Sequence, residues 1–160
     1  MAELCPAVTL ECGKVGDAGG VSHAAEFIDA CLHLTQLPEQ PIRPEDIHLF
    51  HTVARIEVPE QTSFGFGDSP ADIVFSEDLE YYNFTELSAG TVIGHYNNEN
   101  APHLAVVDES GHEIERRFLY YSDGKITLAK DVMPSMLTLN AENIRQDCLC
   151  YFMERYPLPE

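Results

Sequence analysis

Residues 117–126, Arg117-Phe118-Leu119-Tyr120-Tyr121-Ser122-Asp123-Gly124-Lys125-Ile126, decide how the larger part of the chain is interpreted. Asp-Gly is a preferred pair for the two-residue turn of a β-hairpin, because both turn positions need positive φ. Aromatic and β-branched residues on either side favour extended backbone. The stretch therefore predicts a strand over 117–121, a turn at 123–124 and a second strand around Ile126.

Short strand candidates surround this hairpin on both sides. They share loose alternation or β-branched runs and lie at 48–58, 73–75, 91–94 and 104–107. Residues 65–68 contain two glycines and are predicted to form a turn or loop. Many short strands with closely spaced turns are typical of a small barrel or sandwich. We therefore predict a β-rich domain, a small barrel or sandwich, over 47–160.

The C-terminal end of this domain fits two structures. Asn140 could cap a helix over 141–155, because Ile144, Cys148 and Phe152 would then share one face. The alternation of Cys148, Cys150 and Phe152 also permits a strand. We favour the helix.

The N-terminal part has a different pattern. Residues 6–12 form a short apolar run that predicts a buried strand, and the glycine-containing segment 13–20 predicts a loop. Ser22 is a candidate N-cap for a helix over 24–37 with one broad apolar stripe. Three prolines then mark 38–46 as a stiff linker. The chain is thus predicted to be α+β, with a strand–loop–helix unit at 1–37, a linker at 38–46 and the β-rich domain at 47–160.

Composition excludes several classes of protein. The 160 residues include 27 acidic and 9 basic side chains, which give a formal net charge of −18. This field would repel nucleic acid and anionic membranes, so neither is an expected partner. The N-terminus has no secretory signal, no apolar run reaches about 18 residues, and the five cysteines are odd in number. We expect a cytoplasmic protein with reduced thiols.

Two segments resemble the succinylglutamate desuccinylase/aspartoacylase family of zinc-dependent hydrolases, which are related to zinc carboxypeptidases. The first is Pro6-Ala7-Val8-Thr9-Leu10-Glu11-Cys12-Gly13, followed by a glycine loop and a helix. The second is Asn83-Phe84-Thr85-Glu86-Leu87, followed by Ala89-Gly90-Thr91-Val92-Ile93-Gly94. The resemblance covers most of 6–95 and implies that 1–37 is the end of an α/β catalytic domain and that the β-rich domain at 47–160 is barrel-sandwich-like.

The resemblance implies hydrolysis of the amide bond of an N-acyl amino acid, a small-molecule substrate. It assigns Glu11 as the catalytic residue that takes a proton from zinc-bound water and returns it to the leaving nitrogen. Such a base typically speeds attack by about 10²–10⁴-fold. A carboxylate at the carboxyl end of an α/β strand points into the crevice where ligands bind, which is consistent with this role.

The family's zinc ligands, His-x-x-Glu and a later His, precede the strand that bears the catalytic Glu, as does its arginine pair. No sequence here matches them. We therefore expect this chain to be the C-terminal portion of such a hydrolase, inactive alone and without bound zinc. Its β-rich domain would line the active-site cleft and select the substrate.

Two other functions remain open. A non-catalytic β-barrel binding or carrier module is the first, because Lys125 follows the Asp123-Gly124 turn, and carrier domains hold their lipoyl or biotinyl lysine in a hairpin. Self-association is the second, because a strand at 6–12 would expose an unpaired edge and could produce a homo-oligomer.

Other patterns favour ordinary structural roles. On a helix, His23, Glu26 and His33 lie on roughly one face, but a solvated surface is the favoured interpretation. His103 lacks a partner at ligand spacing, and Cys148 and Cys150 make at most half of a zinc site. The acidic run at 77–80 could bind a cation or a basic partner, although such runs are more often solvated.

Overall fold

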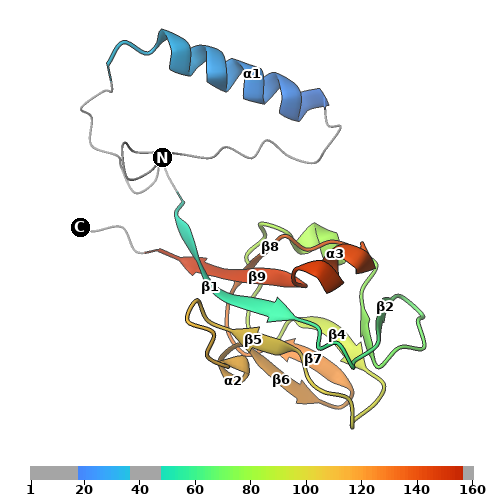
Figure 1. The fold of residues 1–160 in the computed structure, drawn as a ribbon. Helices are drawn as coiled ribbons and strands as arrows, with labels where there is room; N and C mark the ends of the chain where they lie inside the picture. Colours follow the sequence, from blue (N-terminus) through green and yellow to red (C-terminus); the bar gives the residue numbers. More distant parts are fainter. Residues whose placement is uncertain (1–17, 37–47, 157–160) are drawn as a thin grey trace. The chain divides into compact units, whose positions relative to one another are not determined.

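The computed structural model describes residues 18–36 and 48–156 of the chain (Figure 1). The chain divides into two compact units, Met1–Ile42 and Arg43–Glu160. It combines helices with sheets, and strands outnumber helices among the described elements, so the α+β class is confirmed. The strand expected at 6–12 and the linker expected at 38–46 lie outside the described residues.

The first unit contains helix α1 (Ala18–His33). The prediction of a helix over 24–37 that is capped at Ser22 was wrong at both ends, because residues 18–20 are helical and residues 34–36 are not. Glycine costs only about 1 kcal/mol in a helix, so Gly19 and Gly20 do not prevent helix formation. No residue of α1 is buried, and its exposed apolar side chains include Val21, Phe27, Ile28 and Leu32. Within residues 18–36, the described part of its own unit, the amphipathic stripe is uncovered.

The second unit contains two sheets. The first sheet has the order β5-β1-β9-β8 and is antiparallel throughout. Its strands are β1 (Phe50–Glu57), β5 (Ala105–Val107), β8 (Met133–Ser135) and β9 (Cys150–Arg155). The strand predicted over 48–58 corresponds to β1, which pairs with β5 on one side and with β9 on the other (Figure 1).

The second sheet has the order β2-β3-β4-β7-β6, in which only the β2–β3 pair is parallel. Its strands are β2 (Phe64–Phe66), β3 (Ile73–Phe75), β4 (Val92–Tyr96), β6 (Leu119–Ser122) and β7 (Lys125–Leu128). The predicted hairpin is confirmed, because β6 and β7 pair on either side of Asp123 and Gly124. Their φ angles of 51° and 73° are those that the two-residue turn requires.

Three segments differ from the prediction. Residues 64–66 form strand β2 where we expected part of a loop. Residues 117 and 118 belong to a short helix, α2 (Glu115–Phe118), and the predicted hairpin strand begins only at Leu119. The C-terminal helix predicted over 141–155 is wrong beyond Gln146, because α3 (Ala141–Gln146) is followed by β9.

Both patterns seen in the C-terminal sequence are therefore present, one after the other. The Asn140 side chain accepts hydrogen bonds from the backbone N–H groups of Glu142 and Asn143, as an N-cap does. Beyond α3, Cys150 and Phe152 alternate into the core and pair with Ile56 and Ala54 of β1. Pairing with β1 gives the backbone of residues 150–155 its hydrogen-bond partners. A longer helix would lose this pairing.

Side chains from both sheets form one hydrophobic core. Phe118 and Phe152 are almost fully buried, and their ring centroids lie 5.9 Å apart. Ile56 of the first sheet and Leu128 of the second are also inaccessible to solvent.

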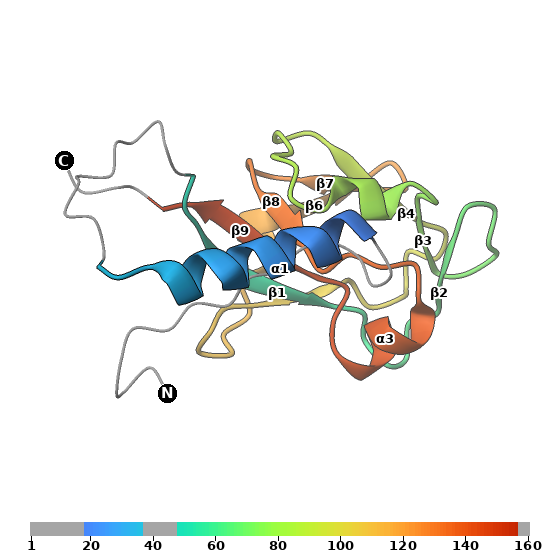
Figure 2. The ribbon, with the colours of Figure 1, turned by 90° about the horizontal axis from the view of Figure 1, so that it is seen from above.

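Within the described segments, helices are too short or too polar to cross a lipid bilayer. Figure 2 shows the same elements from a second direction.

Candidate functional site

The residue that sequence analysis assigned to catalysis, Glu11, lies outside the described residues. The side chains of His23, Glu26 and His33 are exposed on α1. The His33 ring nitrogen Nδ1 lies 2.8 Å from the backbone oxygen of Asp29 within the same helix. Across residues 18–36 and 48–156, three His, Cys, Asp or Glu side chains nowhere come together in a way that could hold a metal ion.

The second segment of the family resemblance is fully described. Asn83 follows the short 3₁₀ helix η2 (Leu79–Tyr82), and its side-chain amide bonds to both backbone groups of Leu137. The Phe84 N–H donates to the Pro134 carbonyl over 2.8 Å, and Leu87 forms a β-bridge with Val132. This segment is thereby fixed along the outer strand β8 of the first sheet.

Glu86 of the same segment belongs to a charged cluster around Arg155. The Arg155 guanidinium donates from Nε and Nη2 to the two carboxylate oxygens of Glu86, over 2.7 and 2.6 Å. Its Nη1 atom lies 2.8 Å from Nδ1 of His48, and its Cζ lies 5.0 Å from the ring centroid of Phe50. These donated hydrogen bonds lower the pKa of Glu86 and raise that of Arg155.

The Arg155 cluster borders a groove of about 550 Å³. Its other lining residues include Lys130, Asp131, Val132 and Glu154. Lys130 Nζ lies 2.5 Å from Glu154 Oε1, so both cations of the groove already have a carboxylate partner. An anionic ligand would have to displace Glu86 or Glu154, so the groove is better suited to a neutral or mixed-charge ligand.

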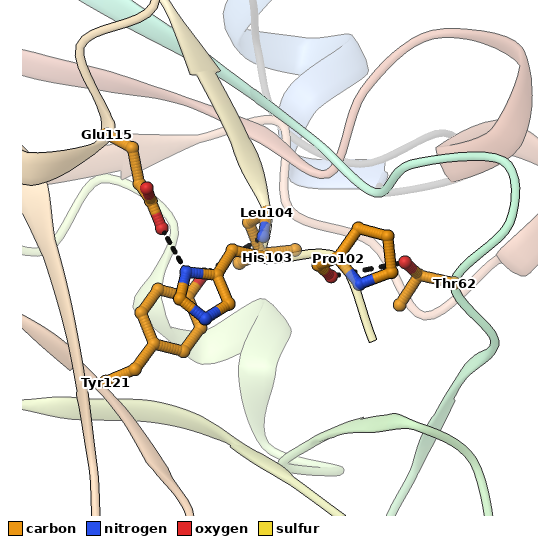
Figure 3. A network of polar contacts seen from close by, with 6 residues as sticks. All are labelled: Thr62, Pro102, His103, Leu104, Glu115 and Tyr121. Atoms are coloured by element: carbon orange, nitrogen blue, oxygen red, sulfur yellow. Dashed lines mark hydrogen bonds and ion pairs between the residues drawn. The ribbon is translucent and has the colours of Figure 1, made fainter. Parts of the chain in front are cut away.

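His103 forms a second polar cluster, shown in Figure 3. Its ring stacks on Tyr121 with centroids 3.7 Å apart and planes 11° apart, and its Nδ1 lies 2.8 Å from Glu115 Oε1. The Tyr121 hydroxyl accepts a hydrogen bond from the Leu104 N–H over 3.0 Å. Burial is the main cause that raises the pKa of Tyr121 far above its ordinary value of 10.0.

An imidazole held by a carboxylate is an arrangement that general-base catalysis uses. The adjoining cavity has a volume of about 10 Å³, however, which is room for about one water molecule and not for a substrate. The Thr62 hydroxyl donates a hydrogen bond to the Pro102 carbonyl (Figure 3). The His103 cluster therefore fastens residues 102–104 to α2 and β6.

Sequence reasoning missed this cluster. His103 and Glu115 are twelve residues apart, and they meet because α2 packs beside β5. Neither helical nor strand spacing predicts such a pair. Cys148 and Cys150 are buried, and burial raises the pKa of Cys148 to about 11.

No family model, curated protein or solved structure matches the chain. Functional interpretation therefore relies on the residues themselves. Of the two segments that carry the family resemblance, the structure describes 83–94 and not 6–13.

Proposed function

We propose that this chain is the C-terminal portion of a zinc-dependent hydrolase that cleaves the amide bond of N-acyl amino acids, similar to the succinylglutamate desuccinylase/aspartoacylase family. The observation that carries the proposal is the exposed apolar stripe of α1. Val21 and Leu32 have exposed fractions of 68 % and 78 %. Helices of α/β domains normally bury such a stripe against a sheet. The rest of a catalytic domain would provide that sheet.

The sequence before α1 supports this proposal. Residues 6–13 resemble the strand that bears the family's catalytic Glu, and α1 is the helix expected after it. The unit at 1–37 would then be the end of an α/β catalytic domain, and the β-rich unit would be its barrel-sandwich-like neighbour. The second resembling segment, at 83–94, lies on that neighbour.

In this reaction Glu11 would accept a proton from the attacking water and pass it to the leaving nitrogen. Zinc, when bound, lowers the pKa of its water to about 7. In the family that the chain resembles, the zinc ligands precede the catalytic Glu, so the metal would be held by residues upstream of Glu11. The 160-residue chain alone is therefore expected to bind no zinc and to hydrolyse no substrate.

The test compares the 160-residue chain with the product of the gene read from further upstream, where we expect an in-frame Gly-x-His-x-x-Glu and a later His. Metal content and amine release from N-acetyl and N-succinyl amino acids are measured for both. The longer product should hold zinc and be active, and Glu11→Gln should lower kcat by about 10²-fold or more while zinc stays bound. Glu3→Gln is the matched control. Zinc and amidase activity in the 160-residue chain would refute the proposal.

A second candidate is a non-catalytic binding or carrier module. The groove beside Arg155 favours it, because about 550 Å³ lies within the usual size of ligand pockets. Lys125 is exposed as the first residue of β7 and follows the hairpin turn. Intact mass of the protein purified from its source decides the carrier form, since a lipoyl or biotinyl group on Lys125 adds a defined mass.

A further inference from the structure

Four exposed apolar side chains lie on two segments of the second unit. They are Tyr81, Phe84, Met136 and Leu139, with exposed fractions of 79, 62, 55 and 37 %. We call these four residues the apolar patch. The other large apolar side chains exposed in residues 48–156 are Tyr120 and the neighbouring pair Leu49 and Tyr156, which a backbone hydrogen bond joins.

Hydrogen bonds join the two segments of the apolar patch. Phe84 donates its N–H to Pro134, and the Asn83 amide holds both backbone groups of Leu137. The Leu139 N–H donates to Glu80 Oε1 over 3.0 Å. The patch is therefore a preorganised surface, so a partner would not need to order it on binding.

The backbone at the apolar patch adopts conformations that bulky residues avoid. Phe84 has φ of 57° and Met136 has φ of 65°. Asp123 is the third non-glycine residue with positive φ in the described segments, and its hairpin turn explains it. Phe84 occupies the third position of a type II turn, in which the Thr85 N–H donates to the Tyr82 carbonyl and Asn83 has φ of −54° and ψ of 129°, a position that normally takes Gly or Asn. Within residues 48–156, Met136 lies in no such hydrogen-bonded turn, and both side chains are exposed. Residues held in this way concentrate at functional surfaces.

Charge around the apolar patch identifies its partner. Residues 76–90 and 131–143 contain no Lys or Arg, and they contain Glu77, Asp78, Glu80, Glu86, Asp131 and Glu142. Arg155 pairs with Glu86, whereas Glu77 and Asp78 are exposed and directly precede η2, the helix that carries Tyr81. A second copy would bring the same acidic rim and a further net charge of −18, which disfavours self-association.

We propose that the apolar patch docks a protein partner through a basic amphipathic segment, whose apolar side chains cover Phe84 and Met136 while its Lys or Arg side chains face the acidic rim. This inference does not depend on the proposed hydrolase activity. Aromatic and methionine side chains at the centre of a surface with a charged rim are typical of such interfaces.

The test uses the full 160-residue chain and a fluorescein-labelled helical peptide of about 15 residues with a Leu stripe and a Lys face. Fluorescence anisotropy gives its affinity, and amide chemical-shift changes locate it. We expect shifts confined to 80–84 and 134–139, and about tenfold or more weaker binding by the double variant Phe84→Gly/Met136→Gly. Glycine tolerates positive φ, so this variant should unfold at the same or a higher temperature.

Matched controls separate a specific surface from the protein's overall acidity. Glu77→Lys/Asp78→Lys should weaken binding, while Glu109→Lys/Glu113→Lys, which changes net charge equally on another exposed loop, should weaken it clearly less. Tyr120→Thr controls for loss of an exposed aromatic ring. Equal loss in both charge variants, or unchanged binding by Phe84→Gly/Met136→Gly, overturns the proposal. The proposal would also be overturned if sedimentation equilibrium showed a dimer of the chain but a monomer of Phe84→Gly/Met136→Gly. The apolar patch would then bind a second copy of the chain.

Discussion

The side-chain amide of Asn83 bonds to both backbone polar groups of Leu137, since Nδ2 donates to the carbonyl and Oδ1 accepts from the N–H, each over 2.8 Å. Asn83→Ala would leave two partly buried groups of a buried residue without partners. Each such group costs about 1–3 kcal/mol. We expect the free energy of unfolding to fall by about 2 kcal/mol or more, as measured by urea denaturation.

Asn97→Ala is the control for this prediction. Its amide donates to the carbonyl of Ala71 at an exposed position, where water can replace the lost bond. The loss of stability should therefore be clearly smaller than for Asn83→Ala. Equal losses would show that the two hydrogen bonds between Asn83 and Leu137 stabilise the fold no more than the exposed one made by Asn97.

Tyr121→Phe isolates the hydroxyl of the His103 cluster. The substitution keeps a ring for His103 to stack on but removes the acceptor of the Leu104 N–H, and Leu104 is only 2 % exposed. We expect a loss of about 1–3 kcal/mol in thermal or urea unfolding. Tyr120→Phe, which removes an exposed hydroxyl from the preceding residue, should change nothing measurable.

Stability should decrease in acid partly through Asp72. Its carboxylate accepts hydrogen bonds from the Ser63 hydroxyl over 2.6 Å, from Asn98 over 2.8 Å and from the Ser63 N–H over 2.9 Å. These bonds, led by the one from the Ser63 hydroxyl, lower the pKa of Asp72 below its ordinary value of 3.8. The unfolded chain then binds more protons than the folded one, so stability is present above the ordinary value and is lost as the pH falls below it.

Urea midpoints measured from about pH 5 to about pH 3 test this assignment. Asp72→Asn should unfold more easily than the unsubstituted protein at neutral pH and should lose less stability on acidification. Glu86 and Asp108 have lowered pKa values too, so part of the decrease in stability with falling pH will remain in this variant. The prediction would be contradicted if the urea midpoint changed equally with pH in Asp72→Asn and in the unsubstituted protein.

The three described cysteines should differ in reactivity. Cys31 is exposed on α1, whereas Cys148 and Cys150 are buried and have raised thiol pKa values. Since the thiolate is the nucleophile, iodoacetamide should alkylate Cys31 quickly and the other two only after denaturant is added. Peptide mass spectrometry after timed labelling measures each site. Rapid native labelling of Cys150 would show that the first sheet opens readily.

The elements that could be predicted from the sequence are those fixed by neighbouring residues. Asp123-Gly124 predicted its hairpin, because the turn geometry is local, and Asn140 predicted its cap for the same reason. The three-residue strands β2 and β8 were missed. Neither contains a β-branched residue, unlike the equally short β3 and β5, which were predicted from their β-branched runs. The pairing partners of β2 and β8, rather than their own residues, make them extended.

The site was less predictable than the fold for the same reason. The contacts of Asn83 with Leu137 and of Glu86 with Arg155 span more than fifty residues. Nothing in the sequence indicates that Glu80, at the end of the acidic run 77–80, accepts a hydrogen bond from the Leu139 N–H. Positive φ at Phe84 was equally hidden, because aromatic residues seldom adopt it.

The strand order has a consequence for how the protein is made. The second sheet ends at Leu128, whereas β9 lies between β1 and β8 and is completed only at Arg155. During synthesis on the ribosome, β1 emerges nearly a hundred residues before its partner β9. Its edge must therefore stay unpaired on that side until β9 has been synthesised, and a nascent chain stalled before β9 would present that edge to chaperones and proteases.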